Sequence, residues 1–128
     1  MRSVVLCGSR RFKRQVKKFA DGLRRFGVDV YAPHHHSGPD EWAALPAEYR
    51  QFIALGLTHD HFQKIRMADA VFIYNKGGYA GPSTTLEIGF AVALGKPVYA
   101  LEKDGELCRH VLLREVVSSA KELARRLK

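Results

Sequence analysis

The sequence contains few cysteines. Its 128 residues include only two, Cys7 and Cys108. Two cysteines cannot build the disulfide framework of a small secreted protein, and their spacing does not match a structural zinc motif. We therefore expect both to be reduced, mainly structural thiols, and we predict no metal site and no cofactor.

Long hydrophobic runs are also missing. The first apolar run, Ser3–Cys7, is followed almost at once by Arg10 and Arg11. A secretory signal or a membrane span needs a longer apolar segment, so we expect a cytoplasmic protein with no membrane partner. With 46% hydrophobic residues, residues 1–128 are predicted to form a single globular domain.

Acidic residues are scarce relative to basic ones. The sequence has 13 Asp and Glu residues against 21 Lys and Arg residues, which gives a net charge of +8. Eight basic residues and only one acid, Asp21, lie between Arg10 and Arg25. The apolar residues of this segment recur at helical spacing, so the basic residues fall mostly on the opposite face. This is typical of a solvated helix that attracts a small anionic substrate. Nucleic-acid binding stays a weaker hypothesis, because no aromatic platform or recognition-helix pattern accompanies the charge.

The segment from Ala68 to Pro97 predicts a buried strand, a glycine-rich loop and a helix. Ala70–Tyr74 is a short apolar run rich in β-branched and aromatic residues, typical of a strand covered on both faces. The loop after it contains glycines and a proline, which permit close approach of the backbone to a ligand and fix the start of a helix. An apolar helix then runs to Gly95, and Pro97 prevents its continuation.

Glu87 is the only acid of this helix, and we expect it in the first turn, near the positive end of the helix dipole. Two interpretations stay open. Ser83, Thr84 or Thr85 can cap the helix, and with Thr84 as the cap Glu87 completes a capping box. Alternatively, the carboxylate faces a ligand held by the glycine loop.

The amino-terminal segment predicts a strand over Ser3–Cys7, a tight turn at Gly8 and then the basic helix. Ser9, the amides at the helix start, and either Arg10 or Arg11 form a plausible phosphate site, because phosphate oxygens need converging N–H donors and a guanidinium. The alternative is an ordinary turn with solvated arginines.

Three adjacent histidines, His34–His36, follow a third predicted strand, Val28–Tyr31. Neighbouring loop residues rarely converge on one ion, so a polar rim is favoured over a metal site. The next segment is expected to be helical from Ala47. Its aromatic residues Tyr49 and Phe52, with Trp42 just before it, are expected to pack in the core, and an aromatic wall over a pocket is the alternative.

A further helix is predicted from Thr58, with Asp60 and His61 at its start. Either of these two side chains can face a ligand from beneath the glycine loop. The alternative is that Thr58 or Asp60 caps the helix.

Strand and helix patterns alternate to the end of the chain. Val98–Leu101 predicts a fourth strand, Val116 and Val117 a short edge strand, and Ser119–Glu122 a capping box that opens the last helix. This alternation predicts an α/β fold: a three-layer, doubly wound, five-stranded parallel sheet in the flavodoxin/Rossmann-like order 2-1-3-4-5. In that order the loops after the first and third strands diverge and leave a crevice, where the Ser9 turn and the Glu87 loop meet.

A glutamate beside a bound sugar can attack the anomeric carbon, which is how glycosidic bonds are split with retention. The leaving group then needs a proton donor, for which Asp60, His61 and water are the candidates. The residues therefore favour glycosidic chemistry in the predicted crevice.

The pattern GxxGxSTxxEIGxAxAxGKP, preceded by an AD-plus-strand segment and an amino-terminal CGS turn, resembles the nucleoside 2-deoxyribosyltransferase superfamily. That superfamily includes 2'-deoxynucleoside 5'-phosphate N-hydrolases, and the resemblance spans nearly the whole chain. It implies that Glu87 is a nucleophile that forms a glycosyl-enzyme intermediate. It also implies that Ser9, Arg11 and Ser83 contact a phosphate, and that the protein forms a homodimer.

Some positions depart from the family pattern. His61 aligns with a family aspartate, with Asp60 adjacent; Gly81 stands where an acid is expected, and Tyr79 has no assigned counterpart. A non-catalytic nucleotide-binding or nucleotide-sensing module of the same fold is therefore the second hypothesis. We predict Glu87, His61 and Asp60 as catalytic residues. The predicted substrate-binding residues are Cys7, Gly8, Ser9, Arg11, Asn75, Gly78, Tyr79, Gly81 and Ser83.

Overall fold

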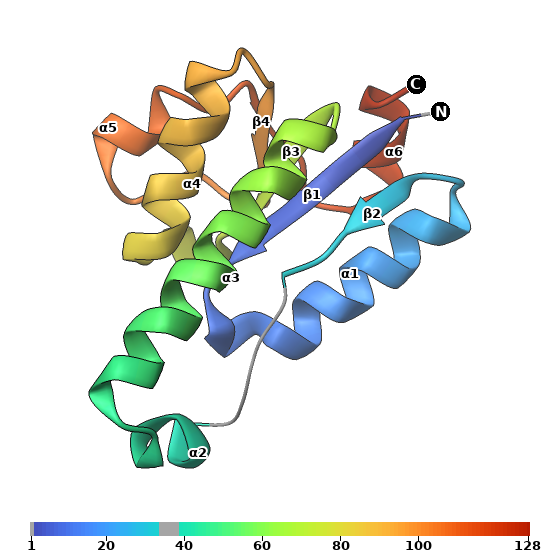
Figure 1. Ribbon diagram of the computed structural model, residues 1–128. Coiled ribbons are helices and arrows are strands. Elements are labelled where there is room, and N and C mark those ends of the chain that lie inside the picture. Colours follow the sequence, from blue (N-terminus) through green and yellow to red (C-terminus); the bar gives the residue numbers. More distant parts are fainter. Residues whose placement is uncertain (1, 34–38) are drawn as a thin grey trace.

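The computed structural model describes residues 2–33 and 39–128. The histidines His34–His36 lie outside the described residues. Five parallel strands form one sheet in the order β2-β1-β3-β4-β5, which confirms the predicted order (Figure 1). The strands are β1 (Ser3–Gly8), β2 (Asp29–Tyr31), β3 (Ala70–Tyr74), β4 (Val98–Ala100) and β5 (Glu115–Val116).

Helices cover both faces of the sheet, as the apolar strands require. Alternate residues of β1 and β3 point to opposite sides, and each set packs into its own core. One core is closed by α1 (Lys13–Arg25) and α6 (Ala120–Arg126), and the other by α3 (Ala47–Met67) and α4 (Pro82–Ala93). Short elements complete the chain: α2 (Pro39–Ala44), α5 (Leu107–His110) and two 3₁₀ turns, η1 (Arg10–Phe12) and η2 (Lys76–Gly78).

The helix that leads into β3 is longer than predicted. The two helical segments expected from Ala47 and from Thr58 are one continuous helix, so the capping role offered for Thr58 or Asp60 is wrong. The Thr58 hydroxyl instead donates a hydrogen bond to the carbonyl oxygen of Ala54 at 2.7 Å. No proline interrupts the segment, and Gly56 alone does not break a helix.

The first half of α3 stands away from the sheet together with α2 (Figure 1). Tyr49 is 62% exposed and Phe52 is 75% exposed, so the prediction that these aromatic side chains pack in the core is wrong. The apolar residues of this half do not meet the sheet, because the sheet ends before the helix does.

The helix α4 begins earlier than the capping-box interpretation requires. Gly81 is the N-cap and Pro82 the first residue, a position where the fixed φ of proline favours a helix. Thr84 is therefore a buried residue inside the first turn, and the capping box with Glu87 is not formed. Glu87 lies in the second turn rather than the first. At the other predicted capping box the N-cap half is confirmed: the Ser119 hydroxyl accepts a hydrogen bond from the Glu122 N–H at 3.2 Å.

No helix among the described residues combines the length and the hydropathy needed to cross a membrane.

Candidate functional site

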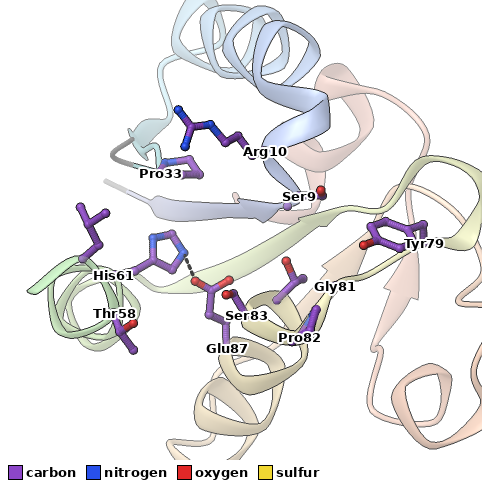
Figure 2. A pocket seen from close by; sticks show the side chains of 13 residues that line it. Ser9, Arg10, Pro33, Thr58, His61, Tyr79, Gly81, Pro82, Ser83 and Glu87 are labelled. Atoms are coloured by element: carbon purple, nitrogen blue, oxygen red, sulfur yellow. Dashed lines mark ion pairs between the residues drawn. The ribbon is translucent and has the colours of Figure 1, made fainter. Parts of the chain in front are cut away.

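A cavity of about 300 Å³ opens where β1 and β3 end and their following loops separate. Such a position, at the carboxyl ends of strands where the strand order reverses, is the usual ligand site of an open parallel sheet. The turn after β1, the start of α4 and one face of α3 form its walls (Figure 2). The lining residues are Gly8, Ser9, Arg10, Pro33, Leu57, Thr58, His61, Tyr79, Gly81, Pro82, Ser83, Thr84 and Glu87.

Glu87 and His61 face each other at the inner end of this cavity. Oε2 of Glu87 lies 3.1 Å from Nε2 of His61. A dashed line marks this pair in Figure 2. Only 14% of the Glu87 side chain and 7% of the His61 side chain are exposed. Burial raises the pKa of Glu87 from 4.5 to about 8, because a carboxylate loses its hydration there. The carboxyl group of the substrate-free protein is therefore largely protonated at neutral pH.

Cys7 lies behind His61. Its Sγ is 3.1 Å from the same Nε2 atom, and the side chain is fully buried at the end of β1. Burial, and to a lesser degree the charge of Glu87, raise the pKa of the Cys7 thiol well above its ordinary value. Cys7 is thus a neutral thiol at neutral pH, not an activated nucleophile.

Nε2 of His61 therefore lies within hydrogen-bonding distance of two groups, the Glu87 carboxyl group and the Cys7 thiol. When Nε2 carries a proton, it donates to the Glu87 carboxylate and orients it towards the cavity. When Nε2 carries none, it accepts a proton from the Glu87 carboxyl group or from the Cys7 thiol. This arrangement can hold a carboxylate in one position and can exchange a proton with it.

The outer part of the cavity suits an anion. The first turn of α4 presents its free N–H groups there, at the positive end of the helix dipole. Arg10 and Ser9 line the opposite wall (Figure 2). Arg11 does not line the cavity; its guanidinium lies 4.0 Å from the ring centroid of Tyr79, a cation–π contact that braces Tyr79 at the rim.

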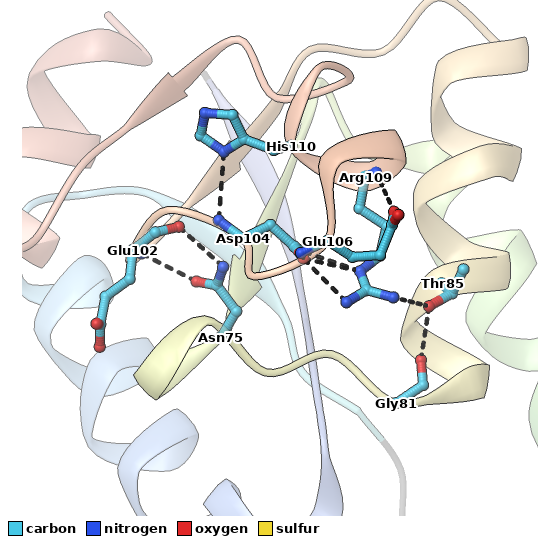
Figure 3. Close-up of polar contacts among 8 residues, drawn as sticks. All are labelled: Asn75, Gly81, Thr85, Glu102, Asp104, Glu106, Arg109 and His110. Carbon is cyan, nitrogen blue, oxygen red and sulfur yellow. Dashed lines mark hydrogen bonds and ion pairs between the residues drawn. The ribbon is translucent and has the colours of Figure 1, made fainter.

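The start of α4 is held by the segment after β4 (Figure 3). Thr85 donates its hydroxyl to the carbonyl of Gly81 at 2.9 Å, and Arg109 donates to the same hydroxyl at 3.4 Å. Arg109 is fixed in turn by Asp104, whose oxygens lie 2.9 to 3.0 Å from the guanidinium. The backbone that shapes the cavity is therefore supported from outside it.

The structure brings seven of the predicted residues into the cavity lining: Gly8, Ser9, His61, Tyr79, Gly81, Ser83 and Glu87. Asp60 lies elsewhere, because its carboxylate pairs with Lys64 at 3.0 Å one turn along α3. Of the two adjacent candidates for the proton donor, His61 is therefore the one beside Glu87. Cys7 reaches the site only through its contact with His61.

Asn75 and Gly78, predicted to bind substrate, do not line the cavity. The Asn75 side chain is fully buried and joins the backbone N–H and carbonyl of Glu102 at 2.9 and 2.8 Å (Figure 3). Gly78 has a φ of 78°, and a Cβ there would lie 2.9 Å from the carbonyl oxygen of Lys103. Both residues join the loop after β3 to the loop after β4. Their contacts within the protein therefore account for an asparagine and a glycine at these positions.

Other lining residues were not assigned to the site from the sequence. Leu57 and Thr58 share one face of α3 with His61, at spacings of four and three residues, and recognition of α3 as a single helix would have found them. Pro33 follows β2 at the same edge of the sheet as Ser9. Arg10 was offered only as an alternative to Arg11.

Known structures resemble this chain over almost its full length. A conserved protein from Enterococcus faecalis V583 is 20% identical, with 99% of this chain and 97% of that chain covered and a TM-score of 0.70. The 2-deoxyribosyltransferase from Bacillus psychrosaccharolyticus is 20% identical, with 95% and 90% covered and a TM-score of 0.63. The CMP N-glycosidase of Clostridium botulinum is 19% identical, with 98% and 97% covered and a TM-score of 0.56.

These likenesses establish the fold. A comparison with curated proteins gave no significant match. The family described as nucleoside 2-deoxyribosyltransferase, however, matches residues 4–120, from the first strand to the start of the last helix. The match includes all three walls of the cavity and its buried glutamate, so the chain belongs to the nucleoside 2-deoxyribosyltransferase family.

Proposed function

We propose that the protein cleaves the N-glycosidic bond of a nucleoside or nucleoside 5'-monophosphate, with Glu87 as the nucleophile. The observation that carries the proposal is the position of Glu87: a buried carboxyl group at the inner end of a switch-point cavity, held by His61 at 3.1 Å. The family to which the chain belongs supports the same chemistry.

In the first step an oxygen of Glu87 attacks the anomeric carbon of the sugar, and the bond from that carbon to the base nitrogen breaks. The electrons of that bond leave with the base, which takes up a proton from water. In the second step water, or the nitrogen of another base, attacks the glycosyl-enzyme ester and releases Glu87. His61 is the positioning residue, because Nε2–H holds the carboxylate in its reactive direction.

A 5'-phosphate is the expected anionic part of the substrate. The N–H groups of the first turn of α4, the Ser9 hydroxyl and the Arg10 guanidinium provide donors on two sides of the outer cavity. The net charge of +8 further favours an anionic substrate. One structural relative is a CMP N-glycosidase by description, and its likeness in fold is consistent with this choice.

The test is release of free base, followed by chromatography, from matched panels of nucleosides and 5'-monophosphates in ribose and deoxyribose forms. The same reactions with an added second base separate transfer from hydrolysis, because only transfer yields a new nucleoside. Release by the wild type and none by Glu87→Gln supports the proposal. No release from any member of the panel, or equal release by Glu87→Gln, contradicts it.

A second candidate function is nucleotide binding without turnover. The burial of Glu87, which raises the pKa of its carboxyl group to about 8, is in its favour, since a protonated acid does not attack the anomeric carbon. A binding module would be stabilised against heat by its nucleotide and would release no base between pH 6 and pH 9, roughly the range in which Glu87 ionises.

We also propose that the protein forms a homodimer through α2 and the first half of α3. The apolar side chains Tyr49, Phe52 and Leu55 are exposed on that segment, which stands away from the sheet (Figure 1). Light scattering after size exclusion should give twice the chain mass, and Phe52→Glu should give the monomer. A wild-type monomer at all concentrations would contradict this.

A further inference from the structure

We propose that Cys7, His61 and Glu87 together bind a thiophilic divalent cation, Zn²⁺ being the ion that fits best. The donor atoms of the three side chains all lie within 4.8 Å of one another. Nε2 of His61 is 3.1 Å from Sγ of Cys7 and 3.1 Å from Oε2 of Glu87. Nothing in the family match assigns a metal to this position.

Two of the three donor separations match a zinc site after a small relaxation. Zinc lies about 2.3 Å from a thiolate sulfur and about 2.0–2.2 Å from an imidazole nitrogen or carboxylate oxygen. In a tetrahedral arrangement such donors stand roughly 3.3–3.6 Å apart. The two separations of 3.1 Å therefore need to grow by a few tenths of an ångström. The third separation, between the Cys7 sulfur and the Glu87 carboxylate, lies within 4.8 Å, and rotation of the two side chains has to bring it into the same range.

Each donor comes from a different rigid element. Cys7 ends β1, His61 lies in α3, and Glu87 lies in the second turn of α4. Because the three elements pack together through one buried core, the donors are already gathered before an ion arrives. Pre-arranged ligands on helices and strands hold a metal more tightly than ligands on loops.

The donor set selects the kind of ion. One thiolate sulfur, one imidazole nitrogen and one carboxylate oxygen favour Zn²⁺ and disfavour Mg²⁺ and Ca²⁺, which take oxygen ligands. Binding releases the proton of the Cys7 thiol and that of the Glu87 carboxyl group to solvent. His61 and Glu87 also line the cavity, so the fourth coordination position faces the space where a ligand or water can enter. Three protein ligands with one open position are the usual pattern of an accessible zinc site.

Binding of the metal would inhibit the proposed cleavage of the N-glycosidic bond. This step depends on the proposed function, whereas the binding itself does not. A Glu87 oxygen bound to Zn²⁺ cannot attack a sugar carbon, and His61 bound through Nε2 cannot hold the carboxylate by a hydrogen bond. One equivalent of Zn²⁺ per chain should therefore inhibit base release.

The direct test is titration of chelator-treated protein with Co²⁺, a spectroscopic substitute for Zn²⁺, followed by displacement with Zn²⁺. We expect one Co²⁺ per chain, a thiolate-to-cobalt charge-transfer band, and the visible bands of tetrahedral coordination. Cys7→Ser should lose the charge-transfer band and weaken Zn²⁺ binding by at least about 100-fold. Cys108→Ser, which removes the exposed cysteine, is the matched control and should bind as the wild type does.

Failure to bind Co²⁺ and Zn²⁺ stoichiometrically, loss of the band in Cys108→Ser, or unchanged binding in Cys7→Ser would each overturn the site. If Cys7→Ser does not fold, the charge-transfer band of the wild type and the Cys108→Ser control still decide whether a buried thiolate is a ligand. Stoichiometric binding by a protein that releases no base would remove the proposed function and leave the metal site. Base release that is unchanged by one equivalent of bound Zn²⁺ would overturn the inhibitory role.

Discussion

Nε2 of His61 lies 3.1 Å from Oε2 of Glu87 at the inner end of the cavity. Burial of the Glu87 carboxyl group raises its pKa to about 8. The contact brings α3 and α4 together at the inner end of the cavity. In the proposed mechanism, whether the nitrogen donates or accepts decides whether the carboxyl group is ready to attack. The first predictions test this pair.

Glu87→Gln is expected to lower kcat for base release by at least about 1,000-fold, because an amide oxygen cannot form the glycosyl ester. Glutamine keeps the size of the side chain and can still accept a hydrogen bond from His61. Steady-state rates measured by chromatography check this. Glu122→Gln, an exposed substitution in α6 that leaves the backbone N–H bonded to Ser119 in place, should keep wild-type rates.

The pH dependence of kcat/KM follows from the burial of Glu87. The reactive form is the carboxylate, so kcat/KM in chelator-treated protein should rise with pH and level off above about 8. The profile of kcat should rise at a different pH, because substrate changes the surroundings of the carboxyl group. A kcat/KM that is flat from roughly pH 5 to pH 9 would contradict the assignment.

Stability should respond to pH through the same group. Below pH 4.5 the carboxyl group is protonated in both states; from there to about pH 8 it ionises only in the unfolded chain, which lowers the free energy of unfolding as the pH rises. Glu87→Gln removes this cost. We expect its gain in stability over the wild type to grow from near zero at pH 4.5 to a few kcal/mol, in order of magnitude, at pH 8.

Urea unfolding at the two pH values measures this difference. A gain that does not change with pH would show that the substitution acts through packing instead.

Arg10 and Arg11 should differ in their effect on substrate choice. Arg10 lines the cavity, whereas Arg11 stacks on Tyr79. Arg10→Gln is expected to raise KM for a 5'-monophosphate by about 10- to 100-fold while KM for the matching nucleoside stays nearly constant. Arg11→Gln is the matched control and should show the smaller effect. A larger effect of Arg11→Gln would restore the assignment implied by the family resemblance.

Asn75 should matter for stability rather than for binding. Its side chain makes two hydrogen bonds with the backbone of Glu102 and is fully buried. Asn75→Ala is expected to lower the free energy of unfolding by about 1–3 kcal/mol, since two partly buried backbone groups of Glu102 lose their partner. Urea unfolding checks this, with Gln63→Ala on the exposed side of α3 as the control. A change below about 0.5 kcal/mol, the size usual for surface substitutions, would contradict it.

Much of the fold could be predicted, because apolar strands, glycine loops and amphipathic helices repeat in a fixed alternation. The position of Glu87 at the switch-point crevice followed from that order alone. The start of α4 could not be fixed so well, since Pro82 and Thr84 are both good starting residues and only tertiary packing chooses between them.

The side-chain partners were harder to predict than the elements. Asp60 and His61 are adjacent in sequence, but a helix turns by about 100° per residue, so only one of them can face α4. The prediction could not choose between them until the register of α3 against α4 was known. The contact of Cys7 with His61 likewise depends on which face of β1 meets α3, and no local pattern reveals it.

The two outermost strands of the sheet, Asp29–Tyr31 and Glu115–Val116, are very short. Each rim therefore offers only a few unpaired backbone groups to another chain, which makes the sheet a poor template for amyloid-like growth. The short edge strands therefore disfavour association of copies by extension of the sheet.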